Sequence, residues 1–279
     1  MTRTPDLEFL ETLARIAGEI HLRHFGRLDP AQVELKRRRD LLTIADSETE
    51  AALIGAIRAA FPGHDILAEE SDASLSGSEW CWIIDPVDGT TNFARGFPVF
   101  AASVALCRRA EPVLGLVEAP QLRERFMASR GEGAYLNGRR LKVSATPDIA
   151  TSLLATGFSY QRNHVARNNV DNFGNLVLKC HDIRRAGSAS VDLAYVAAGR
   201  FDGYWEAYLK PWDVAAGALL VQEAGGRISD FAGGPDWLFG ENCVASNGLI
   251  HEELRAELSG TEPGYSPPLR QAGRRMRGA

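Results

Sequence analysis

The sequence predicts an α+β protein built in two halves, and three observations support this. Two amphipathic helical patterns open the chain and precede a run of strands joined by short turns, which is typical of an antiparallel sheet. After residue 146, helical and strand patterns alternate as in a layered α/β unit. From residue 259 onward Pro, Gly and Arg dominate without apolar periodicity. We therefore predict an N-terminal α+β half over residues 1–146, a C-terminal α/β half over 147–258, and a disordered tail over 259–279.

Size and charge exclude several classes of protein. A chain of 279 residues can bury a large core. Its formal net charge of −5 gives no overall attraction to nucleic acid or to an anionic membrane. Neither a signal peptide nor a run of 18 apolar residues is present. We therefore expect a cytoplasmic protein with no membrane partner and no nucleic-acid partner.

The spacing of cysteine and histidine predicts no zinc site. Single cysteines in apolar segments predict buried, reduced thiols at Cys81, Cys107, Cys180 and Cys243. The histidines show no paired metal-ligand spacing, and we assign no chemistry to His21, His24, His64, His164, His181 and His251.

The first half opens with an amphipathic helix over residues 9–20. A short strand over residues 33–36 follows, and the basic run 37–39 after it is typical of a solvated face. A second helix has its apolar positions at residues 53, 54, 57 and 61, and Pro62-Gly63 ends it.

Strands dominate the remainder of this half. A strand over residues 66–68 leads into Glu69-Glu70-Ser71, and such an acidic pair by itself is typical of a protein surface. Further strands are predicted over residues 98–107, 113–117 and 125–129. Asn137-Gly138 between two short apolar runs is a strong hairpin signal.

The second half alternates between helix and strand. Its predicted elements, in order, are a strand at 153–156, helices at 170–180 and 188–198, a strand at 201–208, a helix at 212–224, strands near Ile228 and Val244, and a helix at 250–258. Two aspartates, Asp46 and Asp213, stand where predicted helices begin. Each fits a capping position as well as a functional one.

The stretch from Trp80 to Phe93 is the one passage that ordinary folding does not require. Its apolar strand ends in Asp85, Asp88 and Gly89, followed by two threonines. Carboxylates at the mouth of a strand, beside a glycine that lets backbone amides approach a ligand, suit a hard metal ion and a phosphate. Asp-Gly is also a turn signal, so an ordinary strand-to-turn junction is the alternative.

Three familiar site types do not fit this stretch. An EF-hand loop starting at Asp85 would need carboxylates where Val87, Gly89 and Gly96 stand. Covalent aspartyl phosphatases usually separate their two aspartates by one residue, and here two residues intervene. The sequence lacks the glycine-rich run ending in Lys-Ser or Lys-Thr that forms a P-loop. What remains is an acidic metal site assembled from several segments.

Such a site would need cations. Clustered carboxylates repel one another by about 4 kcal/mol per pair at a separation of about 4 Å. Magnesium prefers oxygen ligands and retains several waters, which leaves positions for a phosphate oxygen and an attacking water. The acidic cluster therefore predicts Mg²⁺ as the cofactor.

Four separated motifs make the chain similar to one known family. They are Glu69-Glu70-Ser71; Trp82-Ile83-Ile84-Asp85-Pro86-Val87-Asp88-Gly89-Thr90-Thr91-Asn92-Phe93; Arg185-Ala186-Gly187-Ser188-Ala189; and Pro211-Trp212-Asp213-Val214-Ala215-Ala216-Gly217 with Glu223-Ala224-Gly225-Gly226. From Lys36 to about Ile250 the chain resembles the inositol monophosphatase family in its bacterial form. The resemblance implies a layered αβαβα sandwich, with two sheets and helices between and outside them. It also implies a homodimer and a magnesium-dependent phosphatase with two or three Mg²⁺ ions per site, which Li⁺ would inhibit.

The resemblance assigns roles to individual residues. Glu69 and Asp85, with the Val87 carbonyl, would hold one metal ion, while Asp85, Asp88 and Asp213 would hold another. Asp46, Thr90 and Glu69 would be the catalytic residues, and the first two would position the attacking water. Glu70 is not expected to be a ligand, and Lys36 matches a position near a mobile loop. The residues implied in substrate binding are Glu69, Asp88, Gly89, Thr90, Gly187, Ser188, Ala189, Glu206 and Asp213, with the Gly89 and Thr90 amides at the phosphate.

The implied reaction is hydrolysis of a small phosphomonoester by a metal-activated water that attacks phosphorus in line. Inositol 1-phosphate is the leading substrate, and the alternatives are histidinol phosphate, fructose 1,6-bisphosphate and 3'-phosphoadenosine nucleotides. Glu206 favours a polyol or an amine over a second phosphate, because an anion beside a carboxylate is disfavoured. We expect selectivity to lie at Glu206 and around residues 160–165 and 181–185.

A function of a different class stays open. Some bacterial relatives that the chain resembles take part in RNA-linked regulation through protein contacts. The basic run 37–39 and the tail arginines Arg270, Arg274, Arg275 and Arg277 could serve such a regulatory role. The negative overall charge and the absence of an RNA-binding signature argue against it.

Overall fold

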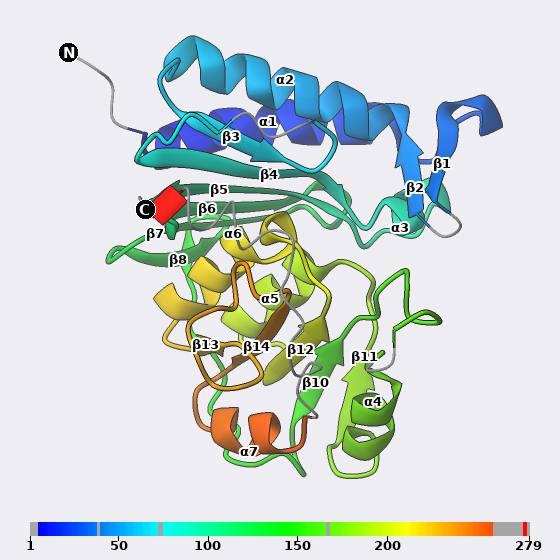
Figure 1. Cartoon of the computed structure of the whole chain (residues 1–279), viewed down its shortest axis with the longest axis vertical. Helices are drawn as coiled ribbons and strands as arrows, with labels where there is room; N and C mark the ends of the chain where they lie inside the picture. The colour runs from blue at the N-terminus through cyan, green and yellow to red at the C-terminus, as the bar shows by residue number, and fades with distance from the viewer. Residues whose placement is uncertain (1–4, 38–39, 72–74, 166–167, 259–275, 278–279) are drawn as a thin grey trace.

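The computed structural model describes residues 5–37, 40–71, 75–165, 168–258 and 276–277. Its elements stack in five layers, as Figure 1 shows: helices, a seven-stranded sheet, helices, a five-stranded sheet, and outer helices. The first layer consists of α1 (Leu7–His24) and α2 (Ile44–Ala60). The apolar faces of both helices pack with one face of the larger sheet in a single core cluster. The predicted α+β sandwich of two sheets with helices between and outside is therefore confirmed.

The larger sheet lies entirely in the first half of the chain. Its strands are β3 (Asp65–Ala68), β4 (Trp80–Asp88), β5 (Ala101–Arg108), β6 (Glu111–Ala119), β7 (Glu124–Ser129), β8 (Gly133–Leu136) and β9 (Arg139–Arg140), in that spatial order. Strands β3 and β4 pair in parallel and the others antiparallel. The predicted hairpin turn joins β8 to β9, with φ of 48° at Asn137 and 78° at Gly138.

The smaller sheet belongs to the second half. Its strands are β10 (Leu153–Thr156), β11 (Asp182–Arg184), β12 (Gly203–Ala207), β13 (Arg227–Ser229) and β14 (Asn242–Ser246). Their spatial order is β11-β10-β12-β14-β13, and β10 runs parallel to both of its neighbours. The division of the chain at residue 146 stays a prediction, and β9 and β10 fall on either side of it.

Two helices fill the space between the sheets, α5 (Ala189–Ala197) and α6 (Pro211–Glu223). Both are apolar on nearly every side, as expected of helices covered all round. A Cβ at Gly217 would lie 2.5 Å from the Leu193 Cβ, and one at Gly115 would lie 3.0 Å from the Ala216 carbonyl oxygen. The two glycines therefore let α6 approach both α5 and the larger sheet closely. This close packing fixes the position of α6.

Short elements complete the structure. They are η1 (Pro30–Gln32), β1 (Val33–Arg37), β2 (Asp40–Thr43), α3 (Thr90–Ala94), η2 (Pro120–Leu122), α4 (Val170–Leu176) and α7 (His251–Ala256). Strands β1 and β2 form a separate antiparallel pair. None of the described helices is long and apolar enough to span a bilayer.

Some elements differ from the sequence-based prediction. Strands β2 and β11 are additional, and the helix predicted over residues 170–180 ends at Leu176, leaving Leu178 86% exposed. All four cysteines are free, and Cys180 is only partly buried whereas the other three are buried. Lys36 lies in β1, but its side chain and residues 38–39 fall outside the described part. Of the predicted disordered tail only residues 276–277 are described, and Met276 is buried in the core cluster between the sheets.

Candidate active site

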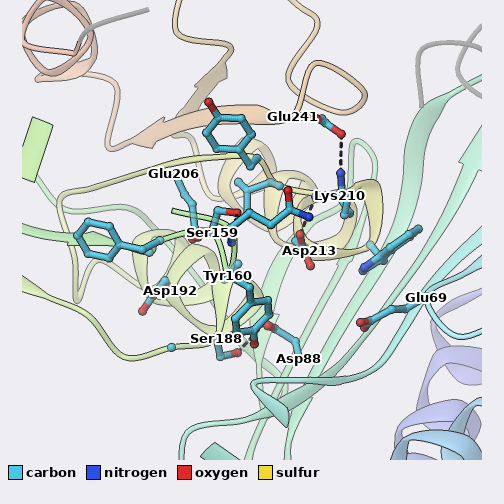
Figure 2. Close-up of a pocket in the computed structure, with 18 of the residues that line it drawn as sticks. Glu69, Asp88, Ser159, Tyr160, Ser188, Asp192, Glu206, Lys210, Asp213 and Glu241 are labelled. Atoms are coloured by element: carbon cyan, nitrogen blue, oxygen red, sulfur yellow. Dashed lines mark hydrogen bonds and ion pairs between the residues drawn. The ribbon is translucent and has the colours of Figure 1, made fainter. Parts of the chain in front are cut away.

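A cavity of about 920 Å³ opens where the two halves of the chain meet. The end of β4 and the starts of α5 and α6 converge on it, and Figure 2 shows Glu69, Asp88 and Asp213 on different sides of it. The predicted site residues that line it are Glu69, Asp88, Gly187, Ser188, Ala189, Glu206 and Asp213. Asp46, Asp85, Val87 and Thr90 are buried and do not line it. The roles assigned to these residues remain predictions.

The segment over residues 85–90, here called the motif loop, begins with a β-bulge. Asp85 pairs with Ser103 of β5, whereas Asp88 pairs with Ala101, so β4 carries one extra residue between the two aspartates. Residues three apart on a regular strand point to opposite faces, and the extra residue brings them to the same face. The Val87 amide donates to Asp85 Oδ1 at 3.0 Å, which stabilises the bulge from within.

Asp88 is held by the start of α5. Its Oδ2 accepts hydrogen bonds from Ser188 Oγ at 2.6 Å, Ser190 Oγ at 2.6 Å and the Ser190 amide at 2.7 Å. Burial raises the pKa of Asp88, and these hydrogen bonds act in the opposite direction. Sequence reasoning missed Ser190. Its position two residues after Ser188 in the first turn of a helix was the available signal.

Asp46 and Asp213 both make the capping contact that was one of the alternatives left open by the sequence, and a functional role for either stays a prediction. Each is the third residue of its helix: Asp46 Oδ2 accepts from the Thr43 amide at 2.9 Å, and Asp213 Oδ2 accepts from the Lys210 amide at 2.6 Å. Asp46 Oδ1 also lies 3.1 Å from Thr90 Oγ1. The capping contact and the Thr90 contact therefore use different oxygens of the same Asp46 carboxylate.

The electrostatics at the motif loop favour a cation. Burial raises the pKa of Asp85 well above its usual range, as do the charges of Glu69, Asp88, Asp213 and Asp46. Burial and the neighbouring Asp88 do the same for Asp213. Within the described ranges no ion pair involves Asp85, Asp88 or Asp213. Asp85 and Asp213 are therefore close enough to other carboxylates to be repelled by them, and within the described residues neither forms an ion pair that would offset this repulsion.

Carboxylate oxygens of Asp88 and Asp213 accept hydrogen bonds from protein donors in the structure. Among the described residues, no three Asp, Glu, His or Cys side chains converge closely enough to hold a metal ion as they stand. Asp88 Oδ2 faces two serines, and Asp213 Oδ2 faces its own helix start. Binding an ion would therefore require these side chains to move closer together.

Two glycines and an asparagine join the motif loop to the second half. Gly89 has a φ of 93°, and a Cβ there would lie 3.0 Å from the Val99 oxygen and 3.3 Å from the Gly187 oxygen. Asn92 Nδ2 lies 2.7 Å from the Val99 oxygen and 2.8 Å from the Ala186 oxygen. Sequence reasoning did not single out Asn92, one of whose partners, Ala186, lies 94 residues along the chain. This close approach places Gly187 and Ser188 beside the motif loop.

Glu206 lines the cavity away from the motif loop. Its Oε2 accepts from the Tyr204 hydroxyl at 2.7 Å, and a Cβ at Gly157 would lie 2.0 Å from the same oxygen. Burial raises the pKa of Glu206 to about 7, although the Tyr204 hydrogen bond and the Arg185 charge lower it. Near neutral pH this carboxyl can therefore serve as an acceptor or, when protonated, as a donor.

The comparisons with known proteins agree on one family. The inositol monophosphatase family model matches residues 3–262. The chain is 44% identical over 274 residues to the Nus factor SuhB of Pseudomonas aeruginosa, covering 96% of this chain and 99% of the relative.

Solved structures give the same answer. An inositol monophosphatase from Anabaena (Nostoc) sp. PCC 7120 is 39% identical, with a TM-score of 0.82 over 92% of this chain and 96% of that one. The extragenic suppressor protein suhB of Bartonella henselae is 38% identical, with a TM-score of 0.85 over 90% and 97% of the two chains. The chain therefore belongs to the inositol monophosphatase family.

Proposed function

We propose that the protein is a magnesium-dependent phosphatase of small phosphomonoesters. The observation that carries this proposal is the group of buried carboxyl groups around Asp85, which repel one another at one end of a cavity. Family membership supports the reaction class. Burying several like charges is costly unless a cation joins them.

The donor set fits Mg²⁺. It consists of carboxylate and carbonyl oxygens, which Mg²⁺ prefers, and contains no thiolate or imidazole. We propose that Glu69, Asp85 and the Val87 carbonyl hold one ion, and that Asp85, Asp88 and Asp213 hold a second. When bound, Mg²⁺ supplies Lewis-acid chemistry, since it stabilises charge on phosphate and acidifies water.

Thr90 and Asp46 are proposed to orient the attacking water. The Thr90 hydroxyl lies 2.9 Å from the Val87 oxygen and 3.1 Å from Asp46 Oδ1, and both atoms accept hydrogen bonds. Its single proton can go to only one of them, which leaves its lone pairs for a water proton. Asp46 Oδ1 can accept a second water proton. The Gly89 and Thr90 amides are proposed to contact the phosphate.

The leaving group would lie toward Glu206, Gly187, Ser188 and Ala189. A carboxyl beside serine and backbone groups suits hydroxyls, and it disfavours a second phosphate on the same molecule. We therefore propose a polyol monophosphate, with inositol 1-phosphate as the leading substrate. The amino-alcohol histidinol phosphate is the alternative that Glu206 disfavours least.

The test is phosphate release from inositol 1-phosphate, histidinol phosphate and fructose 1,6-bisphosphate, compared by kcat/KM with Mg²⁺ and with a chelator. We expect inositol 1-phosphate to give the highest kcat/KM and the chelator to abolish release. Turnover that persists undiminished without divalent metal, or no release from any of the three substrates, would refute the proposal.

A second function is favoured by the relatives named Nus factor SuhB. We propose that this chain also acts as a Nus factor, through protein contacts in a transcription complex in the cytoplasm. Co-elution of the full-length protein, as the proposed homodimer, with a transcription elongation complex would support it. The Asp88→Asn variant should co-elute equally well, and co-elution that requires an intact active site would contradict a separate function.

A further inference from the structure

His21 connects the first helix to the motif loop. It lies in α1, is fully buried, and its Nε2 is 2.8 Å from the Pro86 carbonyl oxygen, 65 residues along the chain. A carbonyl can only accept a hydrogen bond, so Nε2 carries the proton and donates. The partner of this bond is the residue that directly follows Asp85.

Burying a histidine at this position costs stability. Within the described part of the chain its Nδ1 is buried without a hydrogen-bond partner. The ring contacts Phe93 and Phe100 edge-on, with centroid separations of 5.8 Å and 5.6 Å. An apolar side chain would suit these surroundings and would leave no nitrogen stranded. The contact that an apolar side chain could not provide is the hydrogen bond to Pro86.

With that hydrogen bond, the backbone polar groups of Pro86 and Val87 in the β-bulge all have partners. The Val87 amide donates to Asp85 Oδ1, and the Val87 oxygen accepts from Thr90 Oγ1. Pro86 has no N–H, and its carbonyl is satisfied by His21. The two Val87 groups are bonded within the motif loop itself, whereas the Pro86 carbonyl depends on a separate helix.

We propose that His21 is a positioning residue, which holds the Pro86 carbonyl and thereby keeps Asp85 and Asp88 on one face of β4, from which both could contribute to holding the metal ions. This inference rests on the proposed magnesium-dependent function. Without the donor, the bulge loses its only described hydrogen bond to α1, and we expect the two carboxylates no longer to be held on the same face of the strand. The effect is on metal affinity, because His21 is buried and does not line the cavity.

The test compares His21→Leu with His21→Gln by calorimetric titration of the full-length protein with Mg²⁺. Leucine removes the donor, and we expect the Mg²⁺ Kd to rise about tenfold, as for loss of other outer contacts to metal ligands. Glutamine keeps an N–H donor of similar reach, and its Kd should stay within about threefold of wild type. His21→Met, which also lacks a donor and packs adaptably, carries the same expectation as leucine if that variant does not fold.

His251→Leu is the matched control. His251 is equally buried, with Ser229 Oγ and Ser246 Oγ each 2.9 Å from its ring nitrogens, and it does not line the cavity. This variant should lower Tm without changing the Mg²⁺ Kd. An unchanged Kd in His21→Leu or His21→Met, or an equal rise in His21→Gln, overturns the inference and leaves the proposed function standing. Absence of Mg²⁺ binding by the wild type overturns both.

Discussion

The motif loop and the segment over residues 157–165, here called the outer segment, line or underlie the same cavity but are built differently. Asp85, Asp88 and Thr90 are 2%, 9% and 8% exposed, and their hydrogen bonds reach α2 and α5. In the outer segment Tyr160 is 43% exposed, and the Gln161 amide bonds to Ser159 Oγ within the same turn. This difference fits the proposed function, in which the motif loop carries the reaction and the outer segment adjusts which leaving group is accepted.

The largest effect should follow substitution in the motif loop. Asp88→Asn should lower kcat/KM by roughly a thousandfold, the upper range for loss of one preorganised contact. The metal-free variant should be at least as stable as wild type, because burial raises the pKa of Asp88 and the substitution removes that buried charge. Steady-state kinetics and thermal unfolding measure the two effects.

Asp65→Asn is the matched control for this substitution. Asp65 is also buried and accepts hydrogen bonds from Ser76 Oγ at 2.6 Å and from the amides of Gly77 and Ser78 at 3.1 Å. It pairs with Cys81 near the start of β4, whereas the motif loop lies at the end of that strand, so its loss should cost stability and spare kcat/KM. If Asp88→Asn retained near wild-type turnover with Mg²⁺, the motif loop would not carry the reaction.

Thr90→Val should lower kcat by roughly a hundredfold with little change in KM, because it removes the hydroxyl that orients water and preserves side-chain shape. Thr91→Val changes the neighbouring exposed threonine in the same way, and its kcat should stay within about twofold of wild type. Equal kinetic effects of the two variants would remove Thr90 from the proposed catalytic residues.

Metal addition should stabilise the protein, and more strongly at higher pH. In the metal-free fold the pKa values of Asp85, Asp88 and Asp213 are raised, so stability is lost as pH rises and these groups ionise together. Mg²⁺ at about a hundredfold excess over its Kd adds about 2.7 kcal/mol, which corresponds to a Tm rise of roughly 5 °C. Thermal unfolding with Mg²⁺ or chelator should show a smaller rise in acid. A rise independent of pH would contradict binding at these carboxylates.

Glu206→Gln should lower kcat/KM for inositol 1-phosphate about tenfold, the size of one hydrogen bond to a charged group. Release from p-nitrophenyl phosphate, which lacks hydroxyls at the leaving group, should change little. Because burial raises the pKa of Glu206 to about 7, histidinol phosphate should gain kcat/KM relative to inositol 1-phosphate as pH rises through 7. Persistence of this pH dependence in the glutamine variant would assign it to another group.

The smallest effect is expected in the outer segment. Tyr160→Ala should change kcat/KM for inositol 1-phosphate by about twofold, as is usual for substitution of an exposed side chain. The ratio of its kcat/KM values for inositol 1-phosphate and histidinol phosphate should change more than its kcat/KM for p-nitrophenyl phosphate. A hundredfold loss on every substrate would erase the distinction between the two regions.

Most of the fold was predictable from local patterns. The ends of α2 and α5, shortly before Pro62 and Gly199, and the Asn137-Gly138 turn follow from backbone preferences that act within a few residues. Strands β2 and β11 were not predictable, because each has only three or four residues, and its pairing partner rather than its own pattern makes it a strand.

The candidate site was predictable only in part, for the same physical reason. The resemblance named Asp85, Asp88 and Asp213, but the single sequence held no signal that His21 meets Pro86, since the contact joins positions 65 residues apart. A capping role and a site role for Asp46 could not be told apart by sequence, and the structure shows one carboxylate that contacts both the Thr43 amide and the Thr90 hydroxyl. Contacts between residues this far apart in sequence can be identified only in a structure.

The insertion of α6 between the two sheets also has a consequence for synthesis on the ribosome. Asp213 follows Asp88 by 125 residues (213 − 88), so the last of the carboxylates proposed to hold metal is translated well after the others. At about 5–20 residues per second, the delay is roughly 6–25 s. During that interval the nascent larger sheet lacks the helix that covers its inner face. Chaperone binding to ribosome-stalled chains should therefore be strongest for lengths that end before α6 has emerged.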